Sequence, residues 1–256
     1  MGRPVLGAQL YTCRQFAKTI PDIEQTLAKV KKIGYTTVQV SGFGPVDPKE
    51  VAKVLKDSGL KCVSTHMGWP RFQNEIDAVI EEHKMWECDH PAIGGLPKEY
   101  FSEEGLKEFL DELPAVCEKL AAVGMDFSYH NHNHELARHG GKTWLAQLYE
   151  AADPKYLKAE IDTYWITAGG GDPAAWIDTC AGREPLVHFK DMKVTPDRQQ
   201  QFAEIGEGNL NWERIIKACE DGGVEYALVE QDNCYDLDPF ESLEISFKNL
   251  KAMGLE

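Results

Sequence analysis

The sequence lacks paired cysteines, long apolar runs and any signal-like start. Its seven cysteines are scattered and form no CxxC pair, so we expect reduced thiols and no disulfide framework. No apolar run approaches the roughly 20 residues of a membrane span, and the first residues lack the apolar stretch of a secretory signal. These absences predict a cytoplasmic protein with no membrane segment.

Positive charge is also scarce. The chain has 27 Lys and Arg against 42 Asp and Glu, which gives a formal net charge of −15. Proteins that bind nucleic acids gain most of their affinity by neutralising phosphates, and anionic membranes attract clustered basic residues. We therefore expect neither a nucleic acid nor a membrane as partner, and some of the acidic excess can serve a bound cation.

Short β-rich segments alternate with helical patterns along the whole chain. The eight segments predicted to be strands are 5–10, 35–40, 61–66, 89–94, 125–131, 157–162, 185–190 and 226–230. Strict alternation of strands with helices predicts an α/β protein with a parallel sheet. Eight units in a chain of this length predict a parallel (β/α)8 TIM barrel, with residues 1–256 as one domain.

Two features of this pattern bear on the alternatives. An open, doubly wound sheet is the other fold considered, but no GxGxxG turn follows the first strand. The longest stretch without a predicted element covers residues 191–211. Long irregular loops in compact domains are often functional, so we expect this one to lie near the site.

Titratable side chains gather where the last four predicted strands end, which is where barrel active sites form. The fifth strand runs into the segment 130–135, the sixth ends at Asp162, the seventh reaches His188 and the eighth ends at Glu230. Asp162 alone could cap a loop, and Glu230 alone could pair with a lysine. Together, carboxylates and an imidazole that converge on one point predict a site for Mn²⁺, Co²⁺, Fe²⁺ or Zn²⁺ rather than Ca²⁺.

Other side chains are expected around the same mouth. Lys190 lies two positions after His188, so it faces the same side of the strand and can hold a substrate oxygen or pair with an acid. His66 ends the third strand and His130 ends the fifth, and both are candidates for substrate binding. Trp165 follows the sixth strand, where it can form an apolar wall for a sugar ring or pack within a lid.

Four motifs resemble those of the xylose-isomerase-like TIM barrels. They are Glu-Ile-Asp-Thr at 160–163, Leu-Val-His-Phe-Lys-Asp at 186–191, Gly-Glu-Gly-Asn-Leu-Asn-Trp at 206–212 and Val-Glu-Gln-Asp at 229–232. This group contains sugar phosphate isomerases and epimerases, ketose 3-epimerases, hydroxypyruvate isomerase and inosose dehydratase. The resemblance implies a divalent metal, first of all Mn²⁺ with Co, Fe, Zn or Mg as alternatives, held by Glu, Asp, His and Glu. Asp162, His188 and Glu230 match three of these ligands.

The fourth ligand stays open at this point. Epimerases of the group place a glutamate at the end of the fifth strand, where this chain has Tyr129 and His130. Either Glu135 reaches back from the following loop, or a histidine of the 130–134 segment replaces the glutamate. The Tyr-His-Asn-His run resembles the inosose dehydratase side of the group.

The function implied is proton transfer on a sugar or keto-sugar. A divalent metal stabilises the enediolate formed when a carbon next to a carbonyl loses its proton, and a carboxylate or imidazole takes that proton. We assign Glu230 as ligand and base, with His132 or Glu135 as the partner acid or base, and Lys190 to a substrate oxygen.

The same chemistry admits more than one reaction. Isomerisation or epimerisation is the first hypothesis, and β-elimination from a keto-inositol or a 3-keto-glycoside is the second. A DNA-repair nuclease would need further metal ligands and a basic groove, and a sugar-binding barrel without activity would not need Asp162, His188 and Glu230 together. We also expect that such a barrel forms a homo-oligomer.

Overall fold

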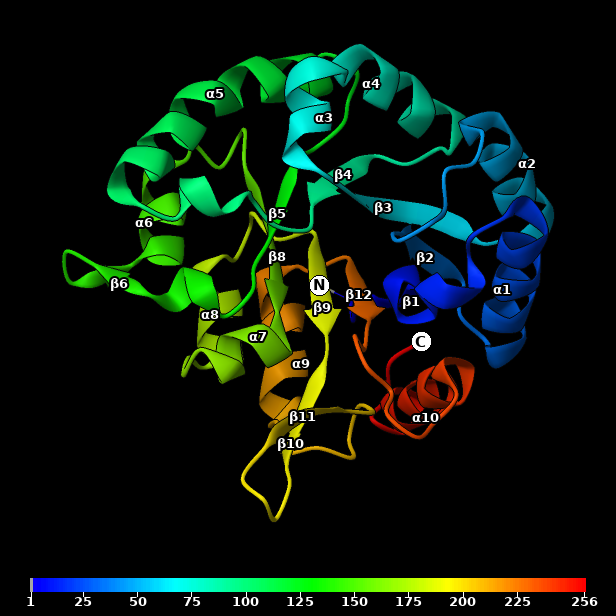
Figure 1. Cartoon of the computed structure of the whole chain (residues 1–256). Helices are drawn as coiled ribbons and strands as arrows, with labels where there is room; N and C mark the ends of the chain where they lie inside the picture. The colour runs from blue at the N-terminus through cyan, green and yellow to red at the C-terminus, as the bar shows by residue number, and fades with distance from the viewer. Residues whose placement is uncertain (1) are drawn as a thin grey trace.

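The computed structural model describes residues 2–256, and its centre is a closed barrel of eight parallel strands with helices around it (Figure 1). The barrel strands in chain order are β1 (Val5–Gln9), β2 (Thr37–Val40), β3 (Lys61–Met67), β4 (His90–Ile93), β5 (Ser128–His130), β8 (Lys158–Asp162), β9 (Leu186–Phe189) and β12 (Tyr226–Val229). Each pairs in parallel with the next, and β12 closes the ring against β1. The predicted (β/α)8 TIM barrel is confirmed.

Seven of the predicted segments contain one of these strands, and the third, 61–66, is one residue shorter than β3. The largest difference is in the fifth, which begins at Ser128 rather than at residue 125. Met125 and Phe127 are buried all the same. Because these buried positions carry apolar residues, the sequence resembles a strand before the first paired residue, Ser128.

Within residues 2–256, ten α-helices surround the barrel. They are α1 (Ile20–Ile33), α2 (Pro48–Ser58), α3 (Trp69–Asn74), α4 (Ile76–Met85), α5 (Glu103–Ala121), α6 (Trp144–Ala151), α7 (Thr163–Ala168), α8 (Pro173–Thr179), α9 (Trp212–Gly222) and α10 (Pro239–Ala252). Their starts follow local chemistry. At α1, the Thr19 hydroxyl accepts a bond from the backbone N–H of Asp22, whose carboxylate accepts from Thr19 in return. None of the helices in residues 2–256 is both long and apolar enough to cross a membrane.

Apolar side chains form two separate clusters. The large one joins the outward faces of the barrel strands to the helices, as Ile161 of β8 and Leu27 of α1 illustrate. The small one contains Val63, Leu186 and Leu228. Leu186 lies two residues before His188 on the same strand, so this cluster lies inside the barrel, toward the starts of the strands.

We expected the stretch 191–211 to be irregular. It instead contains an antiparallel hairpin of β10 (Asp191–Val194) and β11 (Gln200–Ala203). This hairpin projects from the barrel in Figure 1. Its strands carry exposed or half-buried polar residues such as Gln200 and Gln201, which hide the alternation that normally marks a strand. A second small hairpin, β6 (Arg138–His139) with β7 (Lys142–Thr143), follows the fifth barrel strand.

The buried carboxylate of Asp191 holds the hairpin's return segment. It accepts hydrogen bonds from the backbone N–H groups of Met192, Gly206, Gly208 and Leu210 and from the Trp212 indole. A β-carbon on Gly208 would lie 2.3 Å from Asp191 Oδ1, so only glycine fits there. The Gly-Glu-Gly motif and Trp212 therefore supply hydrogen-bond donors to the carboxylate of Asp191.

Candidate functional site

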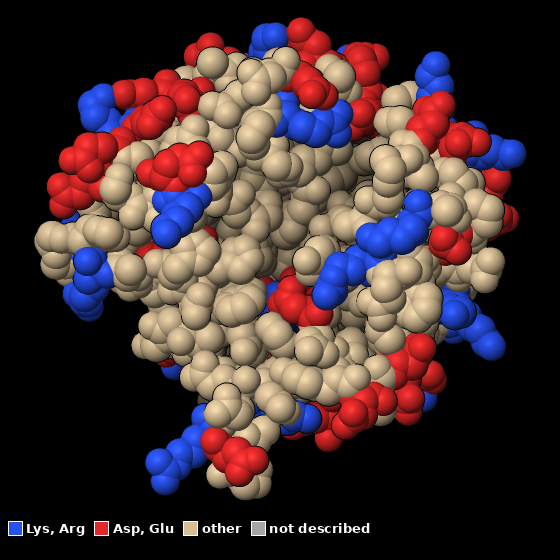
Figure 2. Space-filling view, in the orientation of Figure 1, with Lys and Arg blue, Asp and Glu red and all other residues tan. Residues whose placement is uncertain are grey.

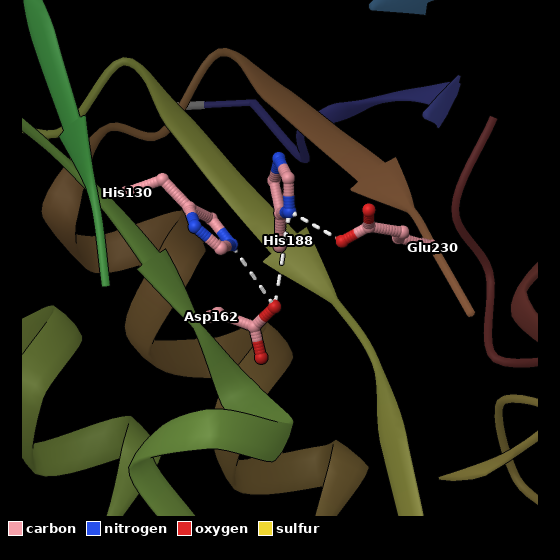
Figure 3. A group of neighbouring side chains, drawn as sticks. All are labelled: His130, Asp162, His188 and Glu230. Atoms are coloured by element: carbon pink, nitrogen blue, oxygen red, sulfur yellow. Dashed lines mark hydrogen bonds and ion pairs between the residues drawn. The ribbon is translucent and has the colours of Figure 1, made fainter. Parts of the chain in front are cut away.

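Four buried side chains converge where the last strands of the barrel end (Figure 3). His130 ends β5, Asp162 ends β8, His188 lies in β9 and Glu230 directly follows β12. His130 Nε2 lies 3.2 Å from Asp162 Oδ2. His188 Nδ1 lies 3.0 Å from Glu230 Oε2 and 3.8 Å from Asp162 Oδ2. All four side chains point toward a common centre.

This group fits a divalent transition metal. Its four ligand atoms lie within 4.8 Å of one another. Bonds of about 2.0–2.2 Å to a metal would place neighbouring ligand atoms roughly 3 Å apart, so the observed spacings need little adjustment. Two imidazole nitrogens and two carboxylate oxygens suit Mn²⁺, Co²⁺, Fe²⁺ or Zn²⁺.

The four-residue group contains His130, whereas Glu135 falls in a second possible metal-binding group with His132 and His134. The Glu135 side chain is fully buried. It accepts hydrogen bonds from the Tyr129 hydroxyl and from the backbone N–H of His132, both at 2.9 Å. Glu135 thus fastens the turn that follows β5, and its predicted roles as ligand or acid/base stay predictions.

Lys190 lies deep in the site, as its spacing from His188 predicts. Its ammonium group is 3.0 Å from Asp162 Oδ2, 2.7 Å from Glu230 Oε2 and 2.8 Å from Asp232 Oδ2. Burial alone would lower the lysine pKa, but these carboxylates raise it. Lys190 is therefore a fixed positive charge in contact with two candidate metal ligands.

A cavity of about 330 Å³ opens above the group. Of the residues predicted for the site, His66, His130, His132, Lys190 and Glu230 line it. Figure 2 shows the molecule hollowed on this face, with charged side chains beside the hollow and a largely uncharged wall. A pocket of this size is suited to a small polar ligand.

Trp165 does not line the cavity but packs behind it. Its ring centroid lies 5.3 Å from that of His132, and the Lys190 ammonium is 5.5 Å from it. Trp165 also meets Phe202 of the β10–β11 hairpin, with centroids 5.8 Å apart. It supports two cavity residues, and the hairpin in turn supports Trp165.

Asp232 was not assigned a role from the sequence, yet it lines the cavity and contacts Lys190. Burial and the neighbouring Glu230 raise the pKa of Asp232. Its position two residues after Glu230 is the signal that could have revealed it, because alternate residues of an extended segment face the same way.

A buried polar chain under the four-residue group was also missed. His66 Nε2 lies 2.7 Å from Glu160 Oε2, and His188 Nε2 lies 2.7 Å from Gln39 Oε1. Burial would raise the pKa of Glu160, but His188 and His66 lower it well below its usual range, so this carboxylate is ionised. Glu160 precedes Asp162 by two positions, the same spacing that marks Asp232.

The histidines of the site differ in protonation. Burial lowers the pKa of His130 to about 4 and that of His132 to about 3, so both are neutral near pH 7. Burial would also lower the pKa of His188, but the carboxylates of Glu160 and Glu230 raise it to about 10. His130 and His132 are thus already in the neutral form that can bind a metal or exchange a proton.

We expect Glu135 to make the free energy of unfolding depend on pH. Burial raises the pKa of this carboxyl group to about 7, above the 4.5 of an unperturbed glutamate. Between these values the unfolded chain loses the proton that the folded chain keeps, so stability falls as pH rises through the interval. Replacing Glu135→Gln should remove that fall, and the variant should gain about 3 kcal/mol relative to the parent between pH 4.5 and 7.

Urea unfolding of both proteins across this pH range measures the effect. The exposed Glu104→Gln is a matched control that should show no such trend. A difference between parent and Glu135→Gln that stays constant with pH would contradict the expectation.

A closed barrel with imidazoles and carboxylates at its strand ends has the architecture of the (β/α)8 enzymes. The chain belongs to the xylose isomerase-like TIM barrel family, whose profile matches residues 27–250. The resemblance expected from the four motifs is thereby confirmed.

Known proteins similar to this chain have several reactions in their names. An inosose dehydratase of Salmonella agona is 22% identical over 225 residues, covering 80% of this chain and 75% of the relative. The structure of a sugar phosphate isomerase/epimerase from Parabacteroides distasonis superposes with a TM-score of 0.83 at 23% identity, covering 99% and 96% of the two chains. An L-ribulose 3-epimerase gives 0.73 at 17% identity, covering 100% and 95%. At these identities, the structural matches show the shared fold.

Proposed function

We propose that this protein is a divalent-metal-dependent sugar isomerase or epimerase that removes a proton next to a carbonyl group. The observation that carries the proposal is the convergence of His130, Asp162, His188 and Glu230 next to a cavity that His130 and Glu230 line. The names of its relatives, which include sugar isomerases, epimerases and a dehydratase, support a small sugar or keto-sugar as substrate. We propose that residues 1–256 act as one cytoplasmic catalytic domain, in a homo-oligomer, without a nucleic acid or membrane partner.

A bound metal, Glu230 and Lys190 would each have a separate role in the reaction. A bound divalent cation, most simply Mn²⁺, supplies the positive charge that makes a proton beside a carbonyl acidic. Glu230 lines the cavity as a carboxylate whose pKa is held low by Lys190 and His188 against the effect of burial. It is the base that we assign to the proton. Lys190 offers its ammonium group to the oxygen on which negative charge develops.

Return of the proton needs a second group at the cavity. His132 lines the cavity and keeps 30% of its side chain exposed, and it is neutral near pH 7. A neutral imidazole can donate on one nitrogen and accept on the other. We therefore assign the partner acid/base role to His132, with Glu135 holding its backbone in place.

A dehydratase or lyase is the second candidate, and His130 favours it. The resemblance implies a glutamate at the end of β5 in the epimerases, whereas this chain has His130 there. Epimerisation needs proton transfer on both faces of the substrate, and β-elimination needs one base and one acid for the leaving oxygen. With one carboxylate fewer, the site suits elimination from a keto-inositol or 3-keto-glycoside, in line with the name of the Salmonella relative.

Elemental analysis of the purified protein tests the metal. We expect about one equivalent of Mn, Co, Fe or Zn per chain, lost in Asp162→Ala and His188→Ala and kept in His139→Ala, which lies outside the group. Circular dichroism checks that the variants stay folded. A parent protein that holds no metal and takes up none on addition would refute the proposal. A following screen for proton exchange in D₂O on keto-sugars separates epimerisation from elimination.

A further inference from the structure

Two basic side chains lie at the mouth of the cavity without a carboxylate partner. Arg14 belongs to η1 (Leu10–Phe16), the short helix that follows β1, and Lys18 lies just after that helix. The recorded bonds of both go to backbone carbonyls, and neither forms an ion pair within residues 2–256. In a chain with a formal net charge of −15, uncompensated positive charge beside a cavity points to a negatively charged ligand.

The guanidinium group of Arg14 is fixed against two residues of the cavity wall. Its Nη1 donates to the backbone carbonyl of Tyr11 at 2.9 Å, and its Nη2 donates to that of Asp232 at 3.0 Å. It also lies over the Tyr11 ring, 4.2 Å from the ring centroid. Both Tyr11 and Asp232 line the cavity. Two of the five N–H groups of Arg14 are thus used, and the other three have no acceptor among the described residues.

Lys18 is held on the same part of the rim by the loop that follows β2. Its ammonium group donates to the backbone carbonyl of Gly42 at 2.9 Å. A β-carbon on Gly42, whose φ is +73°, would lie only 2.9 Å from the β-carbon of Arg14. Glycine therefore allows this loop to pack closely against η1. Because Ser41, the residue before Gly42, lines the cavity, both cations border the cavity mouth.

Other cations beside the cavity are already neutralised. Arg71 contacts the lining residue Met67, at 3.7 Å from its sulfur. Its guanidinium group is paired with Glu82 at 2.8 and 3.1 Å and with Glu75 at 3.3 Å. Lys190, deeper in the cavity, is matched by three carboxylates. Figure 2 shows basic side chains beside the hollow. Among them, Arg14 keeps both its charge and its free donors available for a ligand.

We propose that Arg14, assisted by Lys18, binds an anionic group of the substrate, a carboxylate or a phosphate, at the end remote from the reacting carbonyl. The inference rests on the proposed function for the reaction, but the anion site itself needs neither metal nor catalysis. A planar guanidinium group presents paired N–H donors that match the oxygens of either anion. A substrate held at the rim and at the four-residue group is fixed at both ends, which orients its reacting carbon.

Titration with three related probes, followed by nuclear magnetic resonance, tests the site. The protein is first stripped of metal with a chelator, which is then removed. 5-Keto-D-gluconate carries a carboxylate, D-fructose 6-phosphate carries a phosphate, and D-fructose carries neither. We expect at least one anionic probe to bind about 10- to 100-fold more tightly than D-fructose, as hydrogen bonds to charged groups allow. Arg14→Gln should abolish this preference, and Lys18→Met should reduce it about threefold, as for an exposed charge.

Arg71→Gln is the matched control, because it removes an arginine beside the cavity whose charge Glu75 and Glu82 already neutralise. Its preference for the anionic probes should equal that of the parent. Binding confined to one anionic probe supports the site and identifies the group as carboxylate or phosphate. A parent that binds both anions no better than D-fructose, or a folded Arg14→Gln that keeps the preference, would overturn the inference. Failure of the proposed function would appear separately, as a lack of metal uptake, because this titration contains no metal.

Discussion

Replacing Lys190→Met should lower the free energy of unfolding by about 3 to 5 kcal/mol, the usual cost of removing one partner of a buried ion pair. The ammonium group of Lys190 lies within 3.0 Å of three carboxylates, those of Asp162, Glu230 and Asp232. Without it, their negative charges would repel one another in a site that excludes most water. Urea unfolding at pH 7 measures the loss.

A divalent cation should restore much of this stability, because its charge can replace that of the ammonium group. Unfolding of Lys190→Met should therefore shift to higher urea on addition of Mn²⁺ or Zn²⁺, and by more than in the parent. Lys193→Met, three residues along on the hairpin, has no ion pair within residues 2–256 and serves as control. A loss below about 1 kcal/mol, the value of an exposed pair, would show that the three carboxylates do not depend on Lys190.

Removing the carboxylate of Asp191 should destabilise the protein by about 4 to 5 kcal/mol, near the upper end for single substitutions. Asp191→Ala leaves five N–H donors without their acceptor, among them the Trp212 indole and the backbone N–H of Met192, which both donate at 2.7 Å. Each hydrogen bond to a charged group contributes about 1.5 to 3 kcal/mol, but the freed segment can recover part of this from water. Urea unfolding measures the change.

The loss should also be visible locally. The hairpin turn contains Arg198, an exposed site for trypsin. When the return segment 206–212 is no longer held, the hairpin should open more often and cleavage after Arg198 should accelerate. Asp197→Ala changes an exposed aspartate of the same turn and should alter neither measurement. Unchanged cleavage in a destabilised Asp191→Ala would mean that the carboxylate supports the barrel rather than the hairpin.

The barrel could be predicted from the sequence because period and alternation are local signals. Each predicted strand overlaps an observed one, and the residues at strand ends Asp162, His188 and Glu230 lie close together as expected. The position of Glu135 outside the four-residue group depends on how the chain turns after β5, a turn held by the hydrogen bonds to Glu135. No periodicity carries that information.

The polar chain escaped prediction for a different reason. Gln39 and Glu160 lie in strands whose other residues are apolar, and their partners come from strands up to 149 positions away in the chain. Only the closure of the barrel brings them together. The one local sign of such a hydrogen-bonded chain is a glutamate two residues before a candidate ligand. This spacing places both side chains on the same face of the strand, but it does not reveal which residues bond to the glutamate.

The separation of the two apolar clusters has a consequence for how this barrel can change. Most of its apolar contacts lie in the outer shell between strands and helices, and only a small group lies inside the barrel, toward the starts of the strands. Side chains that point inward near the strand ends therefore contribute little apolar packing to the stability of the barrel. Substitutions among them that keep the buried charges paired alter ligand chemistry with little loss of apolar packing, so one scaffold can host isomerases, epimerases and dehydratases alike.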